Sequence, residues 1–415
     1  MFLKRLPRGA GWMTYSYVAG FALQGAYFVL LARALGAAEY GVFVGALSLV
    51  TVFASVAGLG SGNVLVLNTA RDRERYRIQL GTALVYVSAS FLPLLAITLL
   101  AAQLLAPNVI TALLPLLISE LLFTRVYDVG LQSFQSHDQL KGVAHLNVTT
   151  ALLRVLLCGL FLWFGLEGAE TWSWFYAAAT VLIALAILAV CFARFGTPRL
   201  ERESITTTWR LGVFFALGMS SRILLNDSDK FVLAGSGRTA EAGQYGAAHR
   251  LVNMAFAPLQ AITYSLNTHL FRAGVHGYDA VWRILRRVLP ISAGYVLVAG
   301  LALWLLAPLA VSILGSDYAS VGQMLPVLAV LLVGQAGAYF FGDALMGLGR
   351  QGVRSVLQAS VGVGVLILNL LLTPTYGWLA AASIAIGASL LLAALLCTVF
   401  FIGLHRERRA ETETV

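Results

Sequence analysis

The stretch ARFGTPRLERES, Ala193 to Ser204, is the longest basic connection in the chain that lacks the character of a membrane span. On both sides of it the sequence is strongly apolar. Of the 415 residues, 59% are hydrophobic and only 11% are charged, and the mean hydropathy is +0.82. A water-soluble globular protein does not have this composition, so we expect a polytopic membrane protein divided by this stretch into two halves.

Windows of about 20 apolar residues, the length that crosses about 30 Å of hydrocarbon, predict twelve spans. We expect α-helices, because the segments are long and lack the period-two alternation of an outer-membrane barrel. The predicted fold class is therefore an all-α polytopic membrane protein with twelve transmembrane helices in two six-helix lobes. The predicted spans are 9–33, 41–67, 79–105, 109–135, 142–165, 171–194, 209–233, 242–270, 284–313, 320–347, 353–373 and 376–403.

The two lobes are predicted to be related by an internal repeat. A shift of the sequence by 205 residues places Tyr40 and Gly41 on Tyr245 and Gly246. Two parallel repeats of six spans are typical of transporters that work by alternating access. The predicted organisation is an N-terminal six-helix lobe (1–195), a cytoplasmic linker (196–208), a C-terminal six-helix lobe (209–403) and a cytoplasmic tail (404–415).

The orientation is predicted from the basic residues, which stay on the cytoplasmic side during insertion. Most of the 28 lysines and arginines lie at the N-terminus, at the C-terminus and in the connections that follow even-numbered spans. Both termini of this multi-pass protein are therefore expected in the cytoplasm, with the spans in the inner membrane. The net charge of +9 is an orientation signal and a match to anionic lipid head groups, and we do not expect nucleic-acid binding.

A polar stripe is predicted on one helical face in each lobe, because residues seven apart lie two turns apart on the same side. The same shift of 205 residues takes neutral N-lobe positions to more polar C-lobe positions. Ser48, Ser55 and Gly62 map onto Asn253, Gln260 and Asn267, and Tyr17 and Gln24 map onto Arg222 and Asp229. The stripe is thus neutral in the N-lobe and charged in the C-lobe.

Four arginines remain once those of the connections and the span ends are assigned: Arg125, Arg154, Arg222 and Arg250. Each would cost at least about 2.5 kcal/mol at the centre of a lipid-facing helix, so each is expected to face the protein interior, a cavity or a partner. Arg222 is followed by Asn226 and Asp229 at i+4 and i+7, which predicts one continuous polar face. For Arg222 we favour a role in a cavity over structural pairing.

The structural alternative for Asp229, Lys230 and Arg250 is an ion-pair cluster that holds spans seven and eight together at the membrane surface. It is the favoured interpretation for Asp227, Asp229 and Lys230, with Lys230 reaching to the membrane interface. In span four, Arg125 is expected to neutralise Asp128 at i+3, and Asp343 is the C-lobe counterpart of Asp128. Glu120 either pairs with an arginine, which is favoured, or carries a coupling proton.

Four stretches carry a family resemblance: LLARALGAAEYGVFVGALSLV (30–50), GLGSG (58–62), NDSDKFVLAG (226–235) and GQYGAAHRL (243–251). They resemble the polysaccharide and O-antigen flippases of the multidrug, oligosaccharidyl-lipid and polysaccharide exporter superfamily. The resemblance implies a flippase that moves a polyprenyl-diphosphate-linked oligosaccharide across the cytoplasmic membrane for the biosynthesis of cell-surface polysaccharide or lipopolysaccharide. Membrane lipids and the polymerase or glycosyltransferases of that pathway would be its partners.

A cationic cavity for the diphosphate and polar groups for the sugars would serve this function, because a guanidinium bonds phosphate oxygens in pairs. The predicted ion-coupling residues are Asp229, His249 and Glu120. No catalytic residue, metal or cofactor is predicted, since the histidines are scattered and no GxxxxGK loop is present. The predicted cavity residues are Arg222, Arg250, Arg154, Asn253, Gln260, Asn267, Gln24 and Tyr17, with Tyr264 as a further polar group.

Two other functions were weighed against the flippase. A drug-cation antiporter of the same superfamily would favour a carboxylate in the N-lobe cavity, but span one contains neither Asp nor Glu. A membrane glycosyltransferase or polymerase needs acidic residues on a sizeable external loop, and the connections are too short to supply one. The flippase is therefore the leading prediction and the antiporter the first alternative.

Overall fold

The computed structural model describes residues 8–413, and their side chains except those of 8–11, 13–14, 210–221, 411 and 413. Within these limits the chain consists of α-helices, short 3-10 turns and one π-helical segment, with no strand. It divides into two compact units. Unit 1 comprises residues up to Ile223 together with Ala234–Ala240, and unit 2 comprises Leu224–Leu233 together with Glu241 onward.

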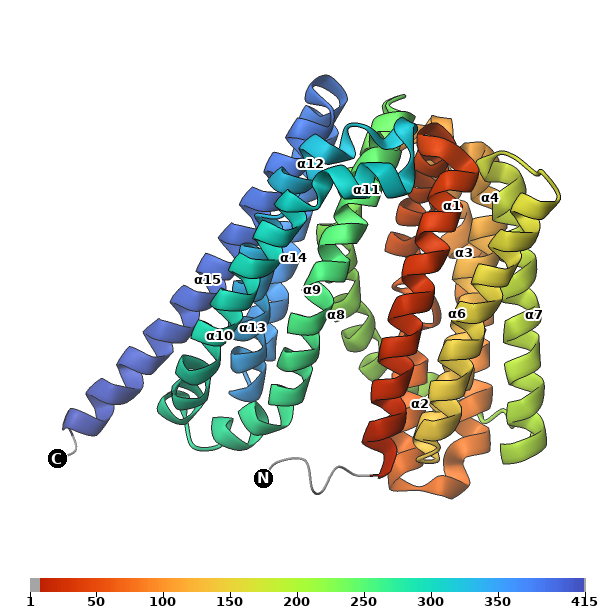
Figure 1. The fold of residues 1–415 in the computed structure, drawn as a ribbon. Helices are drawn as coiled ribbons and strands as arrows, with labels where there is room; N and C mark the ends of the chain where they lie inside the picture. The colour runs from red at the N-terminus through yellow and green to blue at the C-terminus, as the bar shows by residue number, and fades with distance from the viewer. Residues whose placement is uncertain (1–7, 414–415) are drawn as a thin grey trace. The chain divides into compact units, whose positions relative to one another are not determined.

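Unit 1 contains the helices of the first half of the chain (Figure 1). The first helix changes direction at Gly36, whose φ of 68° favours glycine. A second interruption follows at Gly58, Leu59 and Gly60, where φ is 69°, 47° and 63°. The helices are α1 (Arg8–Ala54), α2 (Ser61–Arg71), α3 (Tyr76–Leu105), α4 (Ile110–Leu117), the π-helix η5 (Ile118–Phe123), α5 (Thr124–Ser136), α6 (Leu140–Trp163), α7 (Ala169–Phe195) and the first part of α8 (Arg202–Gly235).

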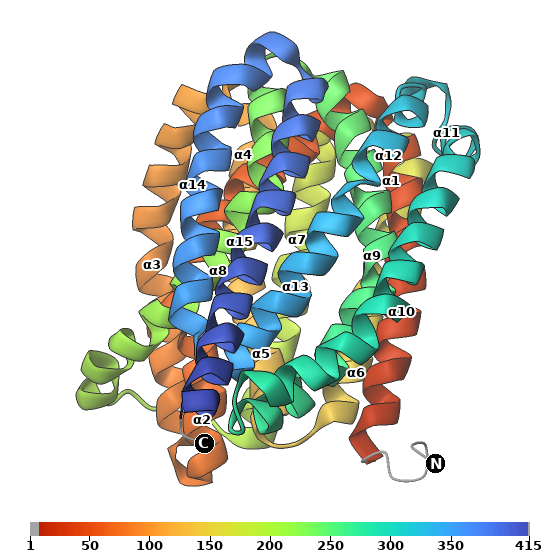
Figure 2. The same cartoon turned by 90° about the vertical axis from the view of Figure 1, so that its left-hand side faces the viewer.

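Unit 2 holds residues 224–233 of α8 and the helices of the second half (Figure 2). In it α13 and α15 run side by side at very short range. A Cβ added to Gly334 would lie 2.7 Å from the Ser389 Cβ, so only glycine permits this approach. The helices are α9 (Thr239–Gly274), α10 (Tyr278–Leu305), α11 (Ala307–Leu314), α12 (Val321–Leu328), α13 (Leu331–Gly347), α14 (Gln351–Tyr376) and α15 (Trp378–Glu413).

The predicted all-α membrane fold is confirmed, and each predicted span coincides with one helix or with consecutive helices. Among the described residues, nine segments are long and apolar enough to cross a membrane by their own composition. One of them, Tyr15–Ala54, covers most of the first predicted span and the beginning of the second, with the kink at Gly36 between the two. The helices α8 and α9 complete the twelve, and they carry the polar clusters described below. The division into units falls within α8, after Ile223, while the lobe limits at 195 and 209 remain a prediction.

The two units share one capping device. In unit 1, Ala169 N at the start of α7 donates to Glu39 Oε2 over 2.6 Å. In unit 2, Trp378 N at the start of α15 donates to Glu241 Oε2 over 3.1 Å. A carboxylate at a helix N-terminus satisfies an orphan N–H and complements the helix dipole. In both units a glutamate just before the second predicted span therefore caps the helix that forms the sixth.

Candidate functional site

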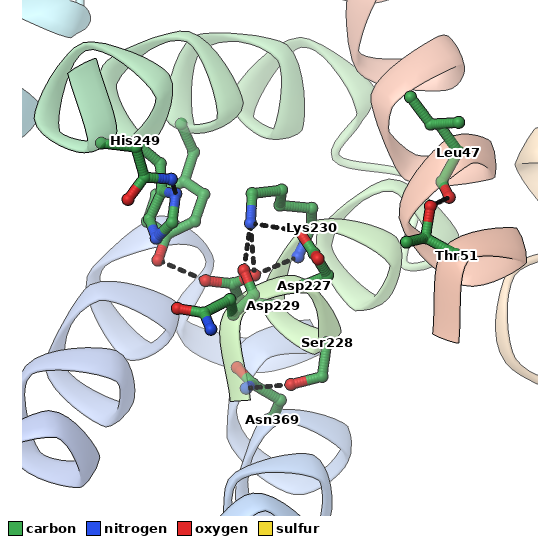
Figure 3. A network of polar contacts seen from close by, with 11 residues as sticks. Leu47, Thr51, Asp227, Ser228, Asp229, Lys230, His249 and Asn369 are labelled. Atoms are coloured by element: carbon green, nitrogen blue, oxygen red, sulfur yellow. Dashed lines mark hydrogen bonds and ion pairs between the residues drawn. The ribbon is translucent and has the colours of Figure 1, made fainter. Parts of the chain in front are cut away.

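A buried charge cluster lies in residues 224–233 of α8, the part of this helix that belongs to unit 2 (Figure 3). Lys230 Nζ donates to Asp227 Oδ1 over 3.0 Å, to Asp229 Oδ1 over 3.4 Å and to the Asn226 carbonyl. The side chains of Lys230 and Asp229 are 8% and 3% exposed. The predicted ion pairs of Lys230 with Asp227 and Asp229 are confirmed. The expectation that Lys230 reaches to the interface is wrong, because its ammonium group turns inward to the carboxylates of Asp227 and Asp229, and the buried charge of Asp229 needs a cation nearby.

The cluster extends to two further helices of unit 2. Tyr245 Oη on α9 donates to Asp229 Oδ2 over 2.7 Å, which joins spans seven and eight as expected. On the other side, Asn369 Nδ2 of α14 donates to Ser228 Oγ over 3.4 Å (Figure 3). Thr373 Oγ1 in turn donates to Asn369 Oδ1. Sequence reasoning missed the α14 contribution, because Asn369 is a single polar residue in an otherwise apolar span.

The predicted polar stripe of α9 is present, but its members have different surroundings. Asn253 is exposed and its amide nitrogen lies 3.1 Å from His249 Nδ1. Gln260 Nε2 donates to Tyr339 Oη of α13 over 2.8 Å. The oxygen of Asn267 is buried and accepts no hydrogen bond from any described residue. Buried polar atoms are normally satisfied, so Asn267 Oδ1 is open to a donor from a ligand or water.

Gln335 of α13 resembles Asn267 in this respect. Its Oε1 atom is also buried and accepts no hydrogen bond within the described part of the chain. The helix that carries it bonds to α9 through Tyr339, one turn further on. Gln335 therefore joins the candidate polar groups of unit 2, although it was not among the predicted cavity residues.

A second polar network lies in unit 1 at the π-helical segment. Tyr176 Oη of α7 donates to Glu120 Oε1 over 2.7 Å, and Arg154 Nη2 of α6 donates to Tyr176 Oη over 3.1 Å. The Arg154 guanidinium also lies 5.0 Å from the Tyr176 ring centroid. Among the described residues Glu120 has no direct ion pair, so the favoured pairing with an arginine is replaced by a bridge through Tyr176. Single π-helical turns are frequent at functional sites.

The expected pair in span four is confirmed, since Arg125 Nη1 lies 3.0 Å from Asp128 Oδ2. Its C-lobe counterpart, Asp343 on α13, lies 2.9 Å from Arg354 Nη1 on α14. One carboxylate is thus neutralised within its helix and the other across two helices. Both ion pairs fit a structural role.

The remaining predicted site residues lie on three helices. Tyr17 and Gln24 are exposed on α1, and Tyr17 is 67% exposed. Arg222 is exposed on α8, and Arg250 is half-buried on α9. The polar face predicted from Arg222 to Asp229 has two different surroundings. Asp229 is buried within unit 2, whereas Arg222 is exposed and belongs to unit 1. A cavity assembled from these residues stays a prediction.

Residues 6–268 match the model of the family described as "Polysaccharide biosynthesis protein". The chain belongs to this family. The match ends within α9, so it covers the described helices of unit 1 and the cluster around Lys230. The match confirms the family resemblance that we inferred from the four sequence stretches. No curated protein matches this chain.

Several solved structures share the fold of this family member. A multidrug resistance MATE family transporter of the MOP superfamily, in its inward-facing conformation, has a TM-score of 0.76 at 16% identity over 95% of this chain and 96% of its own. The lipid II flippase MurJ has a TM-score of 0.64 at 12% identity over 94% and 87%. A MOP superfamily transporter from Pyrococcus furiosus has a TM-score of 0.58 at 17% identity over 96% and 92%. At these low identities the similarity establishes the fold alone, and this fold is the one seen in MOP superfamily transporters.

Proposed function

We propose that this polysaccharide biosynthesis protein is a flippase for a polyprenyl-diphosphate-linked oligosaccharide, acting by alternating access around a cationic cavity. The family match supports a role in polysaccharide synthesis. The shared fold with a lipid II flippase supports a lipid-linked substrate. Two six-helix repeats suit transport by alternating access.

The observation that carries this proposal is the state of the intramembrane carboxylates. Asp128 pairs with Arg125, and Asp343 pairs with Arg354. Lys230 pairs with both Asp227 and Asp229. Glu120 accepts the hydroxyl of Tyr176. Each of these five carboxylates is thus already engaged, and this favours an anionic substrate over the organic cation of a drug antiporter, which needs a carboxylate to neutralise it.

The groups proposed to bind the diphosphate are the arginines at 222, 250 and 154, because a guanidinium offers a planar fork of donors to phosphate oxygens. Groups proposed for the sugar hydroxyls are the carboxamides of Asn267 and Gln335, whose oxygens have no partner among the described residues. Asn253 and Gln260 extend the same α9 stripe. Leaving such an acceptor without a donor costs about 1–3 kcal/mol, which a sugar hydroxyl would offset.

The experiment uses the purified protein in vesicles that contain a fluorescent polyprenyl-diphosphate oligosaccharide. A membrane-impermeant reductant quenches only the fluorescent glycolipid in the outer leaflet. If the protein is a flippase, vesicles that contain it should lose more fluorescence than this outer-leaflet fraction. Vesicles without protein, and vesicles with a fluorescent phosphatidylcholine, are the controls. In parallel vesicles a cationic dye is driven by a proton or sodium gradient. Dye transport without translocation of the glycolipid would replace the flippase by the antiporter.

A further inference from the structure

A groove of about 620 Å³ lies in unit 1 between α3 and the connection that precedes and enters α8. Five residues of α3, between Gly81 and Ala89, form one side of it, and Pro198 and Leu200 form the other. Its volume lies in the range of about 300–1,000 Å³ that is usual for ligand sites. None of these residues belongs to the polar networks assigned to transport.

The groove is a fixed feature, because the connection is bonded to α3 at both of its ends. We name residues 196–205 the strap. At one end Arg199 N donates to the Arg77 carbonyl over 2.8 Å, and the Arg77 guanidinium donates to the carbonyl and hydroxyl of Thr197. At the other end Thr82 Oγ1 donates to Ser204 Oγ over 2.9 Å. The strap is therefore part of unit 1.

Gly81 shows how closely the strap approaches α3. A Cβ at this position would lie 2.9 Å from the Arg199 carbonyl carbon and nearer still to its oxygen. Two turns further along α3, the groove is lined by the small and exposed side chains of Ser88 and Ala89, which leave room for a ligand. From Gly81 to Ala89 the helix rises about 12 Å, a length that suits part of an acyl chain.

The apolar side of the groove continues onto the exposed face of α3. Further along this helix Leu92, Leu100 and Leu104 are 67%, 58% and 73% exposed. The helix belongs to a segment, Arg73–Leu105, that is long and apolar enough to span a membrane. An exposed apolar face on a membrane span is covered by lipid hydrocarbon, so the groove opens toward lipid.

The strap places positive charge beside the groove. Arg199 and Arg202 are exposed, and neither side chain has an ion pair or hydrogen bond within the described residues. Glu201 and Glu203 are exposed on the same segment, but Arg77 adds a third cation at the start of the groove. The N-terminus of α8 at Arg202 adds further positive potential. Basic groups at the end of an apolar groove match the chemistry of an anionic phospholipid.

We propose that this groove binds one anionic phospholipid, with an acyl chain along α3 between Gly81 and Ala89 and the head-group phosphate at Arg199 and Arg202. Arg77 positions the strap for this contact through Thr197. The bound lipid would cover Pro198 and Leu200, and so stabilise the strap against α3. The inference is independent of the transported substrate, because it uses none of the residues proposed for transport.

The test is native mass spectrometry of the full-length protein in detergent, titrated with phosphatidylglycerol or with phosphatidylcholine of the same acyl chains. The wild-type protein should bind phosphatidylglycerol more tightly than phosphatidylcholine. The double change of Arg199→Gln and Arg202→Gln should weaken phosphatidylglycerol binding about 25-fold, at about fivefold per arginine. The matched control, Arg406→Gln with Arg409→Gln on exposed α15 positions, removes the same charge and should leave this binding unchanged.

A second variant tests the apolar half of the site without a change in charge. Ala89→Trp fills the groove and should reduce phosphatidylglycerol binding, whereas Leu104→Trp, on the exposed face beyond the groove, should not. Circular dichroism and thermal unfolding establish that each variant is folded. Equal loss in the two arginine pairs, equal binding of the two lipids, or displacement of phosphatidylglycerol by equimolar polyprenyl phosphate would overturn the proposal.

Discussion

The ammonium nitrogen of Lys230 lies 3.0 Å from Asp227 Oδ1 within unit 2. The same nitrogen lies 3.4 Å from Asp229 Oδ1, so one cation serves two carboxylates. Tyr245 Oη supplies a further hydrogen bond to Asp229. This arrangement makes Asp229 a structural residue in the first instance, and it separates the group at 227–230 from Arg222 on the same helix.

Replacement of Lys230 by Met should destabilise the protein by about 3–5 kcal/mol, because it leaves the buried Asp229 carboxylate and the half-buried Asp227 carboxylate without a cation. The expected result is a lower unfolding temperature and lower abundance in the membrane. The combination of Lys230→Met with Asp229→Asn should recover part of the loss. Arg406→Met, at an exposed position of α15, is the matched control and should change the unfolding temperature little. An unchanged unfolding temperature in Lys230→Met would contradict the buried ion pair.

Replacement of Arg222 by Ala should have the opposite profile. Its side chain is exposed, so the unfolding temperature should stay close to that of the wild type. Translocation of the lipid-linked oligosaccharide should be lost, and Arg222→Lys should restore only part of it, because lysine lacks the planar fork of donors. Asp229→Asn added to Arg222→Ala should leave transport absent. A stable and active Arg222→Ala protein would transfer the phosphate-binding role to Arg250 and Arg154.

Tyr176→Phe tests the network of unit 1. The change removes the hydrogen bond to Glu120 Oε1 and leaves a carboxylate that is 7% exposed without its donor. We expect a loss of about 1–3 kcal/mol in the free energy of unfolding, measured by thermal or chemical denaturation. The double variant Tyr176→Phe with Glu120→Leu should lose less than the sum of the two single changes. Strict additivity would show that the two side chains do not interact.

Ion coupling, if the transport cycle uses it, is predicted to involve Glu120 or His249, since Asp229 is already matched by Lys230. Transport in proteoliposomes should then depend on a proton or sodium gradient, and Glu120→Gln should reduce that dependence more than it reduces glycolipid binding. Rates that stay the same when both gradients are collapsed would exclude coupling through either residue.

The predicted topology has both termini in the cytoplasm and the connection before α7 in the periplasm. Cysteine labelling tests it in a variant in which Cys158, Cys191 and Cys397 are replaced. Gly168 is a poor site for the probe because its φ of 87° disfavours other residues, whereas Glu167 beside it is exposed. A cysteine at 167 should react with a membrane-impermeant maleimide in intact spheroplasts. Reaction only after the membrane is permeabilised would reverse the orientation.

Much of the fold was predictable because a membrane span must satisfy its backbone hydrogen bonds internally and match a fixed hydrocarbon thickness. The limits of α3 and α6 therefore lie within a few residues of the predicted spans. The breaks inside spans were not predictable in the same way. The π-helical turn at Ile118–Phe123 changes no hydrophobic pattern that a window can detect.

The sequence by itself determined the membrane class, the helical spans and contacts between residues one turn apart, such as Arg125 with Asp128, because these depend on composition and helical period alone. Only the tertiary structure decided that Lys230 turns inward, that Tyr176 stands between Arg154 and Glu120, and that the strap lies along α3. Most of these contacts join helices that are far apart in the sequence. Their partners are selected by packing and by the cost of burying an unpaired polar group, and neither quantity can be read from one helix at a time.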